Sequence, residues 1–163
     1  MRRGTRRSVI CRPTTSCPSR TVSTVLPDRE VHRPAGDPCT RHECHLCCLD
    51  TRMTLTEADV ARLQAAGCDD FFRLNTEGDL ELRNHDGRCV LLDGGRCTAY
   101  AARPEGCRLY PLILDLRTDR VVRDEFCPHR GSFPITTGGA ERLRRSVATE
   151  RIEAERRQWG TDD

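Results

Sequence analysis

The chain has 163 residues, of which 36% are hydrophobic and 4% aromatic, and its formal net charge is +2. This length predicts one domain with tails, and a core so poor in large side chains needs metal or disulfides to support it. No stretch reaches the roughly 18 apolar residues of a membrane span, and all 27 basic residues are arginine, which excludes a lysine nucleophile or Schiff base.

Residues 1–36 are predicted to form a disordered basic tail. Six arginines and no acidic residue precede Asp28, and the segment has no periodicity that would bury a face. The composition loosely fits an organelle transit peptide, although a loose basic tail or an overextended start fits it better. Cys11 and Cys17 lie in this tail and are not expected to take part in a site.

A helix is predicted over residues 57–66. Thr56 is a good N-cap, Asp59 stands three residues later as in a capping box, and Gly67 is a natural stop. Cys68 follows the stop, apart from the other cysteines, and is interpreted as a small buried hydrophobe.

Two hairpins are predicted further along the chain. The first has strands near 80–83 and 88–92 and turns at 84–87. The second pairs 112–116 with 121–125 and turns at Thr118-Asp119. A further turn is expected at Asp93-Gly94-Gly95.

Two more helices complete the predicted elements: a short one that starts with Pro104 at its first position, and a charged one over 139–158. The predicted fold class is α+β, a small metal-organised domain with short β-hairpins, two or three helices and a disordered N-terminal tail. The predicted division is a tail at 1–36, a cysteine-cluster metal-binding domain at 37–134 and a C-terminal charged helix at 135–163.

Eight of the eleven cysteines form two groups suited to metal. They are Cys39, Cys44, Cys47 and Cys48, followed by Cys89, Cys97, Cys107 and Cys127. Glycine or proline stands beside each member of the second group: Gly87, Gly95, Gly106 and Pro128. Several thiolates must converge on one point to hold a metal, so the backbone has to bend sharply near each ligand.

The compartment expected from the cysteines is the cytoplasm. No continuous apolar signal region occurs in residues 1–30, and the odd number of cysteines argues against a closed set of disulfides. Thiols that stay reduced favour metal over disulfides. Eight buried core cysteines are the alternative, but chance rarely places four in ten residues.

The spacing bears on the metal. Cys39, Cys44 and Cys47 reproduce the C-x4-C-x2-C run of plant-type two-iron ferredoxins, whereas zinc sites usually use two C-x2-C pairs. We therefore favour an iron–sulfur cluster slightly over Zn²⁺. Adjacent side chains of an extended backbone point opposite ways, so Cys47 and Cys48 would then serve two different sites.

Other chemistry is weaker. His42, His45 and His129 interleave or follow the cysteines and are alternative ligands, although exposure or hydrogen bonding to a ligand is the commoner role. Glutamates interrupt the arginines of the C-terminal helix, so a nucleic-acid partner is not expected.

The pattern resembles the YkgJ-type cysteine-cluster family of zinc- or iron-chelating proteins. The residues that carry the resemblance are the run 39–48, Asp86-Gly87-Arg88-Cys89, Cys97-Thr98-Ala99-Tyr100, Arg103-Pro104-Glu105-Gly106-Cys107 with Arg108-Leu109-Tyr110-Pro111, and Cys127-Pro128. They span about residues 37–130, and the first interval, four residues, is longer than the family's usual two or three. The resemblance implies metal or iron–sulfur binding and, through the flagellin lysine N-methylases that carry a similar cluster, methyl transfer. No G-x-G-x-x-G loop supports the latter.

The sequence thus predicts a metal-binding protein that holds an iron–sulfur cluster or zinc through clustered thiolates, for redox or metal handling. The alternatives are a cluster-dependent protein-modifying enzyme, such as a lysine N-methylase, and a zinc-stabilised interaction module. The expected partners are the metal ion or cluster and an unidentified protein, without a membrane.

Overall fold

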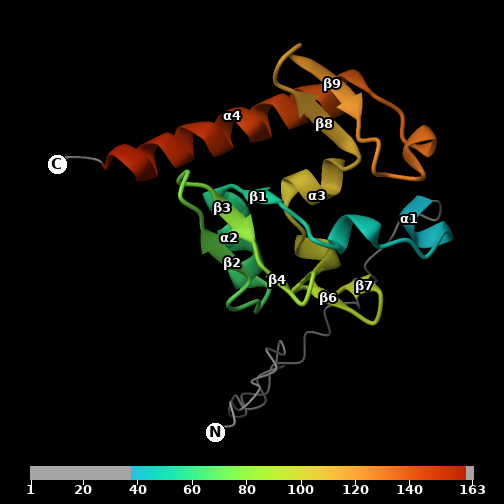
Figure 1. Cartoon of the computed structure of the whole chain (residues 1–163), viewed down its shortest axis with the longest axis horizontal. Coiled ribbons are helices and arrows are strands. Elements are labelled where there is room, and N and C mark those ends of the chain that lie inside the picture. The colour runs from blue at the N-terminus through green and yellow to red at the C-terminus, as the bar shows by residue number, and fades with distance from the viewer. Residues whose placement is uncertain (1–37, 161–163) are drawn as a thin grey trace, which may run out of the picture.

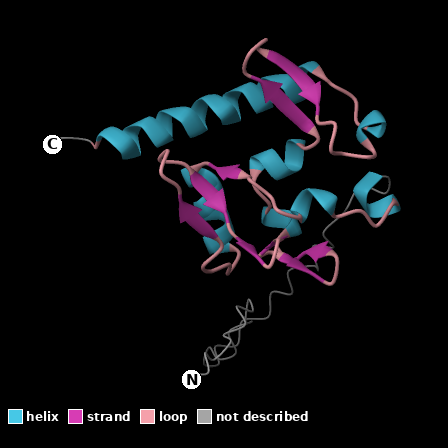
Figure 2. Cartoon of the chain, viewed as in Figure 1, coloured by secondary structure: helices cyan, strands magenta, loops and turns pink. Residues whose placement is uncertain are grey.

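Short strands, short helices and one long C-terminal helix make up residues 38–160, the part of the chain that the computed structural model describes (Figure 2). The helices are α1 (Pro38–Arg41), α2 (Glu57–Ala65), α3 (Glu105–Leu109) and α4 (Thr137–Trp159), with 3₁₀ turns at Leu46–Cys48, Tyr100–Ala102 and Arg130–Ser132. The strands are β1 (Thr54–Leu55), β2 (Phe72–Leu74), β3 (Leu80–Leu82), β4 (Asn84–His85), β5 (Arg88–Cys89), β6 (Leu92–Asp93), β7 (Arg96–Cys97), β8 (Leu112–Asp115) and β9 (Arg120–Arg123). The predicted α+β class is confirmed; the predicted tail, with Cys11 and Cys17, lies outside the described residues, and the division at residues 36 and 134 stays a prediction.

Helix α2 begins where its sequence signals predict. Thr56 accepts a hydrogen bond from the Asp59 backbone N–H at 3.1 Å, and the Thr56 N–H donates to Asp59 Oδ2 at 3.1 Å, which completes a capping box. Leu55 before the cap and Leu63 on the helix are fully buried. The local cap and the buried face therefore fix both the start and the orientation of α2.

The three-stranded sheet has the order β1-β3-β2, with every pair antiparallel. The predicted pairing of 80–83 with 88–92 is therefore wrong for most of its length. Leu80 and Leu82 of β3 are buried in the core on which α2 packs. β1 and β2 contribute to the same core and pair with the two edges of β3. The predicted hairpin around Asp86-Gly87 is present but short: it joins β4 and β5, and the Val90 N–H donates one further hydrogen bond to the Arg83 carbonyl at 3.0 Å.

A second tight hairpin follows directly. β6 pairs with β7 around Gly94 and Gly95, whose φ values are 53° and 76°. Two central residues with positive φ are what a type I′ hairpin turn requires, and glycine adopts that conformation without steric cost. The predicted turn at 93–95 is confirmed. In each of the two hairpins the second strand ends at a cysteine, Cys89 in β5 and Cys97 in β7.

Helix α4 lies across the hairpin β8–β9 and extends over the turn between β2 and β3 (Figure 1). Leu143 of α4 is buried against Leu109 and Leu112 in a second small core. At the other end of α4, a Cβ at Gly78 would lie 2.7 Å from the Ala154 carbonyl oxygen, so only glycine allows this approach. Among residues 38–160, none of the helices combines the length and the apolar surface that a membrane crossing requires.

Candidate metal centre

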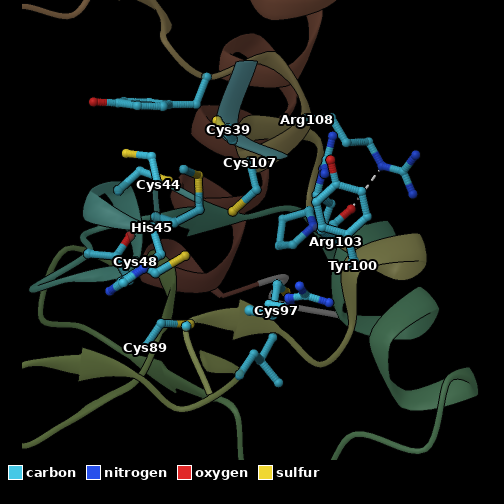
Figure 3. A pocket seen from close by; sticks show the side chains of 18 of the residues that line it. Cys39, Cys44, His45, Cys48, Cys89, Cys97, Tyr100, Arg103, Cys107 and Arg108 are labelled. Atoms are coloured by element: carbon cyan, nitrogen blue, oxygen red, sulfur yellow. Dashed lines mark hydrogen bonds between the residues drawn. The ribbon is translucent and has the colours of Figure 1, made fainter. Parts of the chain in front are cut away.

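A cavity of about 650 Å³ lies where the loop after α1, the two small hairpins and α3 meet (Figure 3). Seven of the eight predicted ligands line it: Cys39, Cys44, Cys47, Cys48, Cys89, Cys97 and Cys107. Four stretches of chain between residues 39 and 107 thus place thiols on one hollow. Cys127 is not among the lining residues, and Cys68 is buried in the core of α2 instead.

Backbone hydrogen bonds hold the first cysteine group against the hairpins. The Cys44 N–H donates to the Cys39 carbonyl at 2.9 Å, which closes the loop between these two cysteines. The Asp50 N–H donates to the Gly87 carbonyl at 2.8 Å, and Leu49 forms a β-bridge with Arg88. The loop therefore becomes an extra partner of the strand that carries Cys89.

The glycines beside the cysteines act in two ways. Gly87 and Gly95 have positive φ and form the predicted bends. Gly106 instead lies inside α3, where a Cβ would overlap the sulfur of Met53, another lining residue of the cavity. Its small size allows α3 to approach the cavity wall closely.

Cys47 and Cys48 face the same cavity, and the interpretation that they point opposite ways is wrong. They lie in a 3₁₀ turn, whose backbone is not extended, and the Cys48 N–H donates to the His45 carbonyl at 2.9 Å. The pKa of the Cys48 thiol is raised far above its ordinary value, first by its hydrogen bond to Cys47, then by burial and by the neighbouring charges of Cys89 and Cys107.

Burial is the main cause of the raised pKa values of Cys89 and Cys107. A backbone hydrogen bond from Leu91 lowers the pKa of Cys89, and the charges of Cys97 and Cys47 raise it. The charges of Cys89, Cys47 and Cys97 raise the pKa of Cys107, and the Arg103 guanidinium lowers it. Without a cation these thiols are protonated at neutral pH, because burial and, after it, repulsion between gathered thiolates disfavour the charged form. Metal binding must therefore release protons here.

Cys127 approaches the first cysteine group from outside the lined cavity. It is 6% exposed, and its pKa is raised by burial and then by the charges of Cys44 and Cys47. The rings of His42 and His129 stack with centroids 3.9 Å apart and an interplanar angle of 3°. This stack ties the loop after Cys39 to the loop after Cys127.

The thiols surround the hollow without converging on a single point. Across residues 38–160, no three Cys, His, Asp or Glu side chains stand close enough to hold one ion. Soft thiolates nevertheless fit zinc and iron–sulfur clusters. Another observation also fits a bound group: Nδ1 of His45, which lines the cavity, is buried and has no hydrogen-bond partner in the described structure.

The other wall of the cavity was not predicted as part of a site. It contains Met53, Tyr100, Arg103 and Tyr110. The Arg103 guanidinium carbon lies 3.8 Å from the Tyr100 ring centroid, and the pKa of Tyr110 is raised by burial and by its hydrogen bond to Asp124. Tyr100, Arg103 and Tyr110 lie in the stretch that carries the family resemblance, and this resemblance is the sequence signal that pointed to them.

The family comparison agrees with this geometry. Residues 38–128 match the model of the CxxCxxCC family, described as "Putative zinc- or iron-chelating domain". The match covers 91 of the 163 residues, so the chain belongs to this family of cysteine-rich metal-chelating domains. Comparisons with curated proteins and with solved structures returned no match.

Proposed function

We propose that this protein holds an iron–sulfur cluster or zinc through clustered cysteine thiolates and uses it in redox or metal handling. The proposed ligands are Cys39, Cys44, Cys47, Cys48, Cys89, Cys97, Cys107 and Cys127. The observation that carries the proposal is the lining of one cavity by seven of them. We also propose that the thiols are kept reduced in the cytoplasm and that a protein partner exchanges electrons or metal with the site.

The size of the cavity supports a cluster over a single ion. Its volume is about 650 Å³, room for roughly twenty waters at about 30 Å³ each. A single ion drawing four thiolates together would fill little of this space, whereas a cluster of several atoms bridges separated ligands. The ferredoxin-like run of Cys39, Cys44 and Cys47 points the same way.

The absorption spectrum of protein purified without oxygen tests the choice of metal. An iron–sulfur cluster gives visible charge-transfer bands that bleach on reduction, whereas zinc, with its filled d shell, gives none. We expect the coloured form. Colourless protein that carries only zinc would overturn the cluster and favour the zinc-stabilised interaction module.

A further inference from the structure

Asp59, on α2, is a carboxylate in the core that bonds two different parts of the fold with its two oxygens. The residue is 1% exposed. Oδ2 accepts from the backbone N–H and the hydroxyl of Thr56, at 3.1 and 3.0 Å. Oδ1 accepts from the Glu105 N–H at 3.0 Å and from Arg62. One oxygen therefore caps its own helix, and the other reaches the first residue of α3.

Arg62 extends this contact along residues 102–105, which we call the strap. Its Nε donates to the Ala102 carbonyl and its Nη2 to the Arg103 carbonyl, both at 3.2 Å. These carbonyls precede α3, and Asp59 binds the N–H at the start of the same helix. The pair therefore holds the strap at both ends.

Helix α3 needs such help because it has only five residues. An isolated helix of this length is unstable in water, and its N-cap, Pro104, makes no side-chain hydrogen bond to the helix. Free N–H groups at a helix start require acceptors, and Asp59 supplies one from 46 residues away in sequence.

The strap ends two residues before Cys107, which lines the cavity, and it contains Arg103, which lines the same cavity and lies over the Tyr100 ring. We propose that Asp59 and Arg62 are positioning residues of the metal centre, which hold Cys107 and Arg103 at the cavity wall. The inference rests on the proposed metal-binding function. It assigns a role at the site to an ion pair that does not line the cavity.

The test compares Arg62→Met with Thr56→Ala in the full chain. Arg62→Met removes the two hydrogen bonds that Arg62 makes to the strap carbonyls and keeps most of the apolar stem. Thr56→Ala instead removes a partner of Oδ2 and leaves Oδ1 with Glu105. Both variants lose stability, the cap alone costing about 1 kcal/mol. Only Arg62→Met should speed the release of metal to a chelator, by about tenfold, the lower end of the effect of residues that support ligands.

The labelling rate of Cys107 supplies a second readout that needs no metal. Iodoacetamide and mass spectrometry on metal-free protein should show Cys107 alkylated several-fold faster in Arg62→Met than in wild type, with Thr56→Ala unchanged. The inference would be overturned if metal release in both variants increased only in proportion to their loss of stability. It would also be overturned if Cys107 were labelled equally fast in wild type and both variants. If wild type holds no metal, the proposed function fails, and the labelling alone still decides whether Arg62 positions Cys107.

Discussion

Cys47 illustrates at the residue scale what spacing predicts and what it does not. Its charge raises the pKa values of Cys48, Cys89, Cys107 and Cys127. That these residues belong together was predictable, because soft ligands cluster in sequence around turns. Which thiols meet was not, because it depends on a 3₁₀ turn at Cys47 and on hairpins brought in by tertiary packing.

A pair of serine substitutions separates ligand from core at this scale. Cys47→Ser should remove most of the bound metal, whereas Cys68→Ser should keep it, because Cys68 is 4% exposed and packs in the core of α2. Burying a hydroxyl there should lower the free energy of unfolding by about 1–3 kcal/mol. Elemental analysis and urea unfolding measure the two effects; equal metal loss in both variants would show that the ligand set is wrong.

At the element scale, the predictions that held rest on local signals. The cap at Thr56 places α2, and the turn at Asp119 places the hairpin β8–β9. The predicted pairing of 80–83 with 88–92 failed for β3, because strands of two or three residues have too little pattern of their own to show that β1 and β2 are the partners. Their partners are chosen by the apolar face on which Leu80 and Leu82 are buried.

Helix α4 carries a carboxyl group that should make stability depend on pH. Burial raises the pKa of Glu150 from 4.5 to about 7; the Ser146 hydroxyl opposes this, and the charges of Asp59, Asp79 and Glu153 add to it. The folded state therefore holds a proton between these two values that the unfolded chain releases. This contribution to stability is complete below about pH 4.5 and is lost by about pH 7.

Glu150→Gln should remove this dependence. At pH 8 the variant should be more stable than wild type by about 1–3 kcal/mol, since one pKa unit corresponds to 1.36 kcal/mol, and at pH 4.5 the two should be nearly equal. Urea unfolding at both pH values measures this, with the exposed Glu155→Gln as the matched control. The same difference at both pH values would contradict the assignment.

At the scale of the whole molecule, two small cores support the cavity. One contains Leu55, Leu63 and Phe71, and the other Leu109, Leu112 and Leu143. With 4% aromatic residues, the core was expected to be poor in large side chains and to need metal for support. The α+β class was predicted from the helix and hairpin signals along the chain. The aromatic wall of the cavity was not predicted, because Tyr100 and Tyr110 carry no spacing that marks a site and only the family resemblance of their stretch pointed to them.

Removal of the metal should cost most of the fixed tertiary structure. The proposed ligands run from Cys39 to Cys127, so bound metal closes long loops whose ordering costs entropy. Structural zinc can supply about 10–16 kcal/mol, comparable with the whole stability of a domain, about 5–15 kcal/mol. Near-UV circular dichroism should be lost on chelation, while α2 persists weakly. Unchanged amide protection across residues 80–127 in the metal-free form would contradict this.

The most direct test of the central claim is the metal content of protein purified without oxygen, measured together with the number of thiols that titrate freely. The eight proposed ligands should be protected from a thiol reagent, and iron or zinc should be present in near-stoichiometric amounts. A well-folded, metal-free protein in which all eight thiols react freely would contradict the account.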